Sequence, residues 1–593
     1  MTINLRLTAI RKEMRILGID AYIVPSGDPH KSEYVPDRWN SRAWISGFDG
    51  SSGTAIITQD HAGVWTDSRY FIQAAEQLSD SDFELHKLEI PHTPEHLLWL
   101  RDNLEDGATI GFDAWMNSPA QARQLAKALA EKNIVFNSEH DLIGKIWDTQ
   151  PIIPTAKVFE LDEKYAGQSR TEKFKHLRTQ IKKNEGKQYL VTTLDDIAWL
   201  LNLRGNDVDC NPVFVGYVVV TENDVQLFVN AKKFKPELKL RLENDGVVFQ
   251  PYSKVESYLK KIEENILVDR ATVNLRLYNS IPEKFRIETK NIIEALKTIK
   301  NDIEIKHFRS VMVKDGVALV RLFRWLEQQL KRRTVSEVEL AEKLKKLRKA
   351  QGEYYGESFD AIVGYKGNGA IVHYKPKVET CANMENEGML LLDSGGQFFN
   401  GTTDITRTIS FNEPTEQQIL DFTLVLKGHI ALAMARFPEG TNGVQLDTIA
   451  RQHLWRYQRN FGHGTGHGVG FFLNVHEGPQ RIGPTIGAKS KLPFQSGMVT
   501  SNEPGIYRAN EYGIRIENLI LCKEAAETDF GKFLEFETIT LFPIQQKLID
   551  KSLLSKDEKD WLNNYHQKVF DQLSPQLNKA EVSWLKRECR LMK

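Results

Sequence analysis

The chain has few cysteines for its length, and they lie far apart. The four are Cys210, Cys381, Cys522 and Cys589 among 593 residues, and no two of them form a Cys-x-x-Cys pair. This spacing argues against a disulfide framework and against a zinc site built from thiolates. It fits a protein of a reducing compartment.

Long hydrophobic runs and a strong net charge are also missing. The first residues form an amphipathic pattern with basic residues between the apolar ones, which is not the continuous apolar core of a signal peptide. The best apolar stretch, residues 213–220, is too short to cross a bilayer. The formal net charge of −1 gives no overall field for nucleic acid or an acidic membrane surface. We therefore expect a cytoplasmic protein with no nucleic-acid or membrane partner.

The length exceeds what one hydrophobic core normally serves, so about three domains are expected. Residues 1–150 alternate helical and strand-like stretches, with a hairpin pattern over 53–67 followed by a helix over 68–78. A proline-containing segment, 148–159, resembles a linker. A second α/β stretch fills 151–302. The third part, 303–530, opens with a long amphipathic helix, and residues 531–593 add strands and a helical finish.

Five residues of the third part stand out as candidate metal ligands. They are Asp393, Asp404, His467, Glu503 and Glu517, in the segments LLLDSGG, GTTDITRT, HGTGHGVG, SNEPG and IRIEN. A lone Asp or Glu is more often a cap or a solvated residue, so the set carries the argument. Acids that follow apolar strand residues are costly to bury unless they are paired or metal-bound. Four carboxylates and one imidazole suit two hard or borderline divalent ions that share bridging carboxylates.

The spacing of the five residues indicates two hairpins. Asp393 and Asp404 flank the turn-forming SGGQFFNG, and Glu503 and Glu517 flank a second set of turn residues. His467 lies between them in the glycine-rich segment 462–470, which has neither a dinucleotide-binding nor a P-loop pattern. We expect its glycines to let the backbone pass close to the metal site.

With these motifs the chain resembles the aminopeptidase P family, the Xaa-Pro aminopeptidases among the pita-bread metallopeptidases, in its long three-domain cytosolic form. The resemblance runs from SGFDGSSGTAIIT and WTDSRYFIQA through GNDVDCNPVF to GNGAIVHY, HGTGHGVGFFLNVHEGP and GIRIEN. It implies an α/β and α+β fold: two creatinase-like α/β domains (1–150 and 151–302), a pita-bread catalytic domain (303–530) and a C-terminal extension (531–593). It also implies peptide substrates with a penultimate proline and a homodimer.

The resemblance implies a dinuclear centre at the five acidic and imidazole positions. One ion is then held by Asp393, Asp404 and Glu517, and the other by Asp404, His467, Glu503 and Glu517, with water or hydroxide between them as the nucleophile. Oxygen-rich ligation favours manganese, and cobalt, iron and zinc stay open.

Further positions match the family outside the ligand set. The resemblance implies catalytic roles for His373, His463, His476 and Arg515, and substrate contacts for Arg69, His373, His476 and Tyr507. A proline nitrogen needs a nearby proton donor as it leaves, which histidine supplies near neutral pH. The plainer interpretation of each histidine is a hydrogen-bonded core residue. Asn502 stands where many relatives carry Asp, next to the ligand Glu503.

Two alternative functions stay open at this point. Prolidase, an Xaa-Pro dipeptidase, uses the same five ligands, although the three-part length favours the aminopeptidase. A pita-bread domain without catalysis that only binds peptides or histones is the more distant alternative, because such domains lose metal ligands. Methionine aminopeptidase lacks two large preceding domains.

Overall fold

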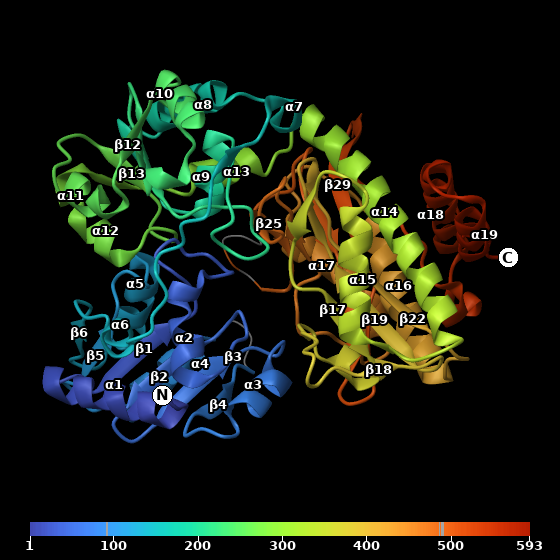
Figure 1. Ribbon diagram of the computed structural model, residues 1–593, viewed down its shortest axis with the longest axis horizontal. Coiled ribbons are helices and arrows are strands. Elements are labelled where there is room, and N and C mark those ends of the chain that lie inside the picture. The colour runs from blue at the N-terminus through green and yellow to red at the C-terminus, as the bar shows by residue number, and fades with distance from the viewer. Residues whose placement is uncertain (90–92, 486, 488–490) are drawn as a thin grey trace. The chain divides into compact units, whose positions relative to one another are not determined.

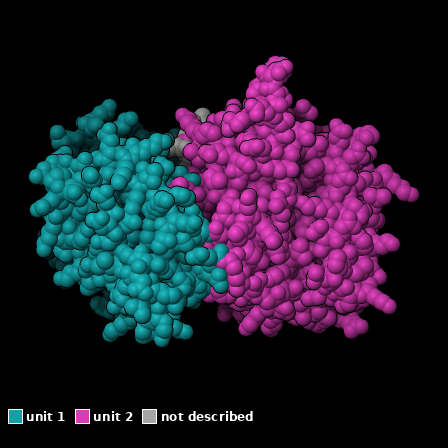
Figure 2. Space-filling model, turned by 90° about the horizontal axis from the view of Figure 1, so that it is seen from above, with its two compact units in different colours: residues 1–163, 168–295 teal, residues 164–167, 296–593 magenta. Residues whose placement is uncertain are grey.

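The computed structural model describes residues 1–89, 93–485, 487 and 491–593. The chain divides into two compact units, coloured separately in Figure 2: residues 1–163 with 168–295, and residues 164–167 with 296–593. Among the described residues, no helix has both the length and the apolar character that crossing a membrane requires.

The first unit opens with a six-stranded sheet in the order β4-β3-β2-β1-β5-β6. Its strands are β1 (Ala21–Pro25), β2 (Thr54–Thr58), β3 (Ala62–Thr66), β4 (Glu84–Lys87), β5 (Thr109–Phe112) and β6 (Val135–Asn137). Its helices are α1 (Ile3–Leu17), α2 (Ser41–Ser46), α3 (Phe71–Leu78), α4 (Glu95–Asn103), α5 (Pro119–Ala128) and α6 (Leu142–Ile146). The predicted hairpin is β2–β3, and the predicted helix after it is α3.

A second six-stranded sheet in the same unit has the order β12-β11-β10-β8-β13-β14. Its strands are β8 (Gln188–Val191), β10 (Tyr217–Val220), β11 (Val225–Phe228), β12 (Val247–Gln250), β13 (Ile266–Val268) and β14 (Arg286–Glu288). The helices here are α8 (Arg170–Lys183), α9 (Leu194–Leu201), α10 (Pro236–Asn244), α11 (Val255–Leu259), α12 (Leu275–Ser280) and α13 (Ile292–Lys297).

The two sheets share one topology. In each, three strands pair antiparallel in the middle, namely β1-β2-β3 and β8-β10-β11. The outer strands then add in parallel on both sides. The sequence predicted two segments of one class, and the strand order shows that they repeat one architecture.

The second unit begins with helix α14 (Asp302–Leu330), whose N-terminus is closed by a capping box between Asn301 and Glu304. Its predicted apolar face, Leu319 to Leu330, is buried. Gly316 lets this helix pack closely, because a Cβ there would lie 2.4 Å from the carbonyl oxygen of Leu541. Figure 1 shows α14 beside α15 (Glu337–Lys349) along this unit.

Two sheets of the second unit carry the candidate site. The smaller one has the order β17-β19-β22 and contains β17 (Ile362–Tyr365), β19 (Met389–Ser394) and β22 (Ile405–Ser410). The larger has the order β23-β30-β29-β26-β24-β25, with β23 (Arg436–Pro438), β24 (Gly466–Gly468), β25 (Glu477–Ile482), β26 (Val499–Asn502), β29 (Asn518–Thr528) and β30 (Gly531–Thr538). A separate hairpin joins β27 (Gly505–Arg508) to β28 (Tyr512–Arg515).

Helices α16 (Glu416–Ala433) and α17 (Gly443–Trp455) complete this unit with α18 (Lys556–Leu573) and α19 (Lys579–Glu588), which form the red end of the chain in Figure 1. The smaller strands β16 (Tyr354–Glu357), β20 (Gly396–Phe398) and β21 (Gly401–Thr402) form one sheet beside the site.

Candidate metal centre

The first pair of candidate ligands comes from neighbouring strands. Asp393 lies in β19, and Asp404 lies one residue before β22, which pairs antiparallel with β19 so that Asp393 is opposite Thr406. Both side chains are buried. The sequence placed Asp404 inside the returning strand, whereas the strand begins at Ile405. The hairpin nevertheless brings the two carboxylates to one end of the strand pair.

The second pair is arranged in the same way. Glu503 follows β26 and Glu517 precedes β29, and these strands pair antiparallel through Asn502 and Asn518. The backbone N–H of Glu517 donates to the carbonyl oxygen of Thr406 at 3.1 Å. This hydrogen bond joins the second pair of ligands to β22, and hence to the first pair.

His467 reaches the same place from β24. A Cβ at Gly466 would lie 1.9 Å from the carbonyl oxygen of Ser501, so only glycine lets β24 pack this closely on β26. The His467 Nδ1–H donates to the carbonyl oxygen of Gly468 at 3.0 Å. Its Nε2 then faces Asp404 Oδ2 and Glu503 Oε1, each at 3.5 Å. The lone pair on His467 Nε2 and the two carboxylates repel one another, and a cation between them would relieve this repulsion.

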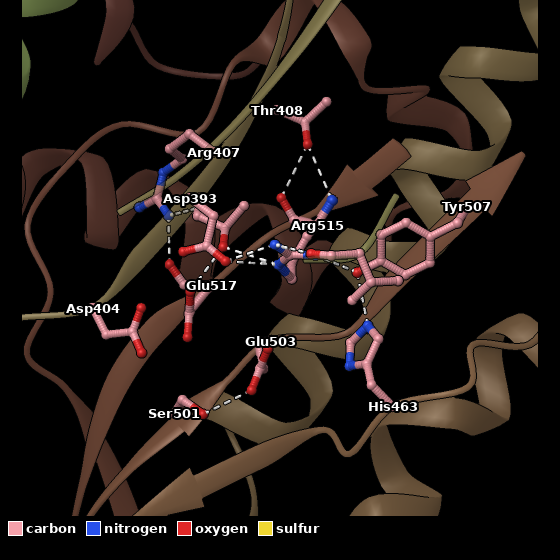
Figure 3. A network of polar contacts seen from close by, with 12 residues as sticks. Asp393, Asp404, Arg407, Thr408, His463, Ser501, Glu503, Tyr507, Arg515 and Glu517 are labelled. Atoms are coloured by element: carbon pink, nitrogen blue, oxygen red, sulfur yellow. Dashed lines mark hydrogen bonds and ion pairs between the residues drawn. The ribbon is translucent and has the colours of Figure 1, made fainter. Parts of the chain in front are cut away.

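The site concentrates negative charge in a buried place. Burial and the neighbouring carboxylates raise the pKa of Asp404 and of Glu517 well above its ordinary value. Burial, with the charge of Asp393, raises the pKa of Glu503 to about 7 although Arg515 opposes the shift. Figure 3 shows Asp404, Glu503 and Glu517 gathered around one space.

The donor set fits bound divalent cations. One donor atom each from Asp404, His467 and Glu517 lies within 4.8 Å of the others. Asp393 Oδ1 is buried and has no hydrogen-bond partner within the described ranges of the chain. An unsatisfied buried carboxylate oxygen is costly, and a metal ion satisfies it. These oxygen and nitrogen donors suit hard or borderline divalent metals.

A chain of hydrogen bonds runs from the candidate metal ligands to His463. Arg515 donates to Asp393 Oδ2 at 2.6 Å and to the hydroxyl of Tyr507 at 2.6 Å. That hydroxyl lies 2.7 Å from His463 Nε2, while His463 Nδ1–H donates to the Gly464 carbonyl. The tautomer is thereby set, and Tyr507 donates to the Nε2 of the neutral imidazole. Burial raises the pKa of Tyr507 to about 12, so its hydroxyl keeps its proton.

Three residues that the sequence analysis did not single out hold the ligands in place. The Thr406 hydroxyl donates to Glu517 Oε2 at 2.8 Å and accepts from Arg515 Nε at 3.1 Å. The Ser501 hydroxyl donates to Glu503 at 3.2 Å and accepts from the His467 N–H at 3.0 Å. Arg407 donates to the Glu517 carbonyl oxygen at 2.6 Å. Their only sequence signal is that they lie one or two residues from an acidic residue or, for Arg407, in the strand that follows Asp404.

Helix α17 fixes the glycine-rich segment that carries both histidines. Asp447 accepts a hydrogen bond from the Thr465 hydroxyl at 2.6 Å. Arg451 donates to Asp447 at 2.7 Å and to the carbonyl oxygen of His463 at 2.6 Å. The backbone around His463 is therefore held by a buried ion pair.

The remaining predicted residues lie in three different settings. The His476 ring packs edge-on against His467, with ring centroids 4.3 Å apart. His373 follows Val372, whose carbonyl oxygen accepts a bond from Arg515 at 3.4 Å. Arg69 belongs to the first unit, where it pairs with Asp67 at 2.7 Å.

Four family models together match most of the chain. The Creatinase/Prolidase N-terminal domain matches residues 6–141, and a second model of that description matches 149–304. Metallopeptidase family M24 matches residues 306–524, and the C-terminal region of M24 peptidases matches 532–592. The fold is therefore that of a metallopeptidase with creatinase-type N-terminal domains and a pita-bread catalytic part, as the sequence predicted.

Similar proteins narrow the assignment further. A probable Xaa-Pro aminopeptidase P of Coprinopsis cinerea is 44% identical, over 98% of this chain and 97% of its own. Aminopeptidase P2 of Arabidopsis thaliana is 40% identical, over 96% of this chain and 85% of its own. The X-prolyl aminopeptidase of Caenorhabditis elegans, described as a cytosolic enzyme with a di-nuclear active site, superposes with a TM-score of 0.95 at 34% identity over 100% of both chains. The chain belongs to the aminopeptidase P family.

The prolidase alternative shares less with this chain. An Xaa-Pro dipeptidase from Bacillus anthracis superposes with a TM-score of 0.51 at 23% identity, over 64% of this chain. This similarity shows a shared fold and nothing further.

Proposed function

We propose that the chain is a metal-dependent Xaa-Pro aminopeptidase, which hydrolyses the bond between an N-terminal residue and a penultimate proline. The observation that carries the proposal is the convergence of Asp404, His467 and Glu517, with Asp393 and Glu503 beside them, in one buried place. Membership of the aminopeptidase P family supplies the substrate class.

We assign the five side chains to two divalent ions. Asp393, Asp404 and Glu517 would hold one ion, and Asp404, His467, Glu503 and Glu517 the other. When bound, such ions lower the pKa of water and stabilise negative charge on a carbonyl oxygen. The four carboxylates against one imidazole favour manganese. The unsatisfied oxygen of Asp393 supports its place among the ligands.

Arg515 and Tyr507 hold other residues of the site in position and do not bind the metal ions themselves. Arg515 holds one oxygen of Asp393, which leaves the other oxygen for the metal site. Tyr507 spans Arg515 and His463, so it couples the orientation of that imidazole to the ligand cluster. The Tyr507 side chain also provides an aromatic ring against which a proline ring can pack.

The leaving group sets a further requirement. A proline nitrogen in a peptide carries no hydrogen, so a protonated group has to reach it as the bond breaks. We assign this part of the site to His373, His463 and His476, and substrate contacts to His373, His476, Tyr507 and Arg69. The packing of His476 on His467 supports the assignment for His476, and the hydrogen bonds of His463 support its place beside Tyr507 in the site.

We further propose a homodimer in the cytoplasm, without nucleic-acid or membrane partners. The near-neutral formal charge of −1 supports the absence of nucleic-acid and acidic membrane partners, and the description of the Caenorhabditis elegans relative as cytosolic supports the location.

The test compares Asp404→Asn with a matched control, Asp421→Asn. Both aspartates are buried in the second unit, but Asp421 pairs with Arg459 and Arg508 outside the donor set. We expect Asp404→Asn to lose bound metal and turnover of an Xaa-Pro-Pro tripeptide, while Asp421→Asn keeps its metal. Full turnover by Asp404→Asn would contradict the site. Wild-type activity confined to Xaa-Pro dipeptides would instead make the chain a prolidase.

A further inference from the structure

A second cluster of side chains that could hold a metal lies in the first unit, on the face of the strand pair β3–β4 against which Trp99 of α4 packs. Gly63 and Trp65 share one face of β3, His61 directly precedes the strand with its ring beside Gly63, and the parallel register sets Gly63 beside Glu84 and Trp65 beside His86. His61, Glu84 and His86 therefore share this face. One donor atom from each of the three lies within 4.8 Å of the others.

The two imidazoles face each other through their Nε2 atoms. His61 Nε2 and His86 Nε2 are 3.2 Å apart. Two nitrogens bound to one tetrahedral zinc at about 2.0–2.1 Å are separated by about 3.3 Å, so the distance between the two Nε2 atoms already matches that of a pair that shares an ion. The Glu84 carboxylate lies 3.9 Å from His61 Nδ1 on an exposed side chain that has freedom to turn toward the ion.

Gly63 leaves the space in which this approach occurs. A Cβ at this position would lie 2.8 Å from His61 Nε2 and 2.7 Å from His86 Cδ2. Any other residue here would push the imidazoles apart. The backbone of Gly63 is not in the left-handed region, so what glycine provides here is room beside the two rings.

Aromatic packing orients both rings. The His86 ring stacks on Trp65, with centroids 4.0 Å apart and planes 11° apart, and the His61 ring packs on Trp99 at 4.6 Å. Burial lowers the pKa of both histidines, and the neighbouring His61 lowers the pKa of His86 further. Neutral imidazoles are the form that binds metal.

We propose that His61, Glu84 and His86 form a second metal site, which takes one zinc ion or a similar late divalent metal. Two imidazoles and one carboxylate are a zinc donor set, and solvent supplies the fourth position because Glu84 is exposed. The set contains more nitrogen than the five-ligand centre, so the two sites differ in metal preference. The bound ion links the edge strand β4 to β3.

The test counts metal per chain in the holoenzyme. Protein that carries its catalytic ions is equilibrated with a series of buffered free Zn²⁺ concentrations, and all metals are counted by mass spectrometry. We expect wild type to hold one ion more than His61→Gln/His86→Gln. The matched control is His176→Gln, an exposed histidine of the same unit, which keeps the extra ion.

Two single variants keep the test decisive if the double variant does not fold. Glu84→Gln removes one donor, and Gly63→Ala keeps every donor but fills the space between the rings. Each should weaken binding of the additional ion by about tenfold or more. In wild type, Zn²⁺ should also raise the thermal midpoint of the first unit, and in the double variant it should not.

Equal metal counts in wild type and in the double variant would overturn the proposal. So would equal affinity in Gly63→Ala, because the site depends on the close approach of the two rings. The histidines would then be a hydrogen-bonded pair of neutral imidazoles. This result would leave the peptidase proposal untouched, since the ions that the double variant retains are those of the five-ligand centre.

Discussion

Removing the metals should make the second unit unstable toward alkaline pH. Without cations, burial and mutual repulsion raise the pKa of Glu503 to about 7, and those of Asp404 and Glu517 well above their ordinary values. In the unfolded chain these groups titrate near pH 4. A folded state with the raised pKa binds protons that the unfolded state has released, so its stability is full below about pH 4 and declines as pH rises through the folded pKa.

The pKa shift of Glu503 alone gives the size of the expected loss of stability. A shift from 4.5 to about 7 corresponds to about 3 kcal/mol of unfolding free energy, lost between those two pH values. Bound cations replace the protons, so the holoenzyme should lose much less. Because two compact units need not unfold together, the transition of the second unit has to be followed separately.

The assay is urea unfolding of metal-free wild type and metal-free Glu503→Gln at pH 4.5 and pH 8. Glutamine keeps the shape of the side chain but cannot ionise. We expect the variant to be more stable than wild type by up to about 3 kcal/mol at pH 8 and nearly equal to it at pH 4.5. Groups that do not interact with Glu503 cancel in this comparison, whereas the pKa values of Asp404 and Glu517 fall when the Glu503 charge is removed and add to the difference. Equal stability at both pH values would refute the reasoning that repulsion in the empty cluster is relieved by protons or metals.

Other variants test single contacts. Thr406→Val removes the hydroxyl between Glu517 and Arg515 and should weaken metal binding about 10- to 100-fold in a chelator competition. Thr408→Val in the same strand is the comparison, because it loses contacts to the backbone of Arg515 but none to a carboxylate. Tyr507→Phe should lower kcat/KM by about tenfold or more with metal content unchanged, since it breaks the link to His463; unchanged kinetics would contradict its positioning role. Lys300→Met removes the ammonium group that pairs with the buried Glu477 carboxylate and should cost about 3–5 kcal/mol in urea unfolding, part of which Lys300→Met/Glu477→Gln restores.

The local elements of the fold could be predicted from the sequence. The β2–β3 hairpin and the buried face of α14 follow from alternation and helical spacing, which are properties of a few adjacent residues. The shared strand order of the two N-terminal sheets could not be predicted, because it depends on pairing between segments far apart in the chain. The start of β22 after Asp404 was also missed, since strand ends depend on which backbone groups find partners.

In the candidate site, too, some residues could be predicted from the sequence and others could not. Acids that end apolar strands stand out because burying them without a cation is so costly, and the structure places Asp393, Asp404 and Glu517 in such a setting. The hydroxyls of Thr406 and Ser501 give no such signal, because Thr and Ser are ordinary strand residues whose role appears only when two sheets meet. Charge in an apolar context thus points from the sequence to the candidate metal ligands, whereas the groups that orient them require the folded chain.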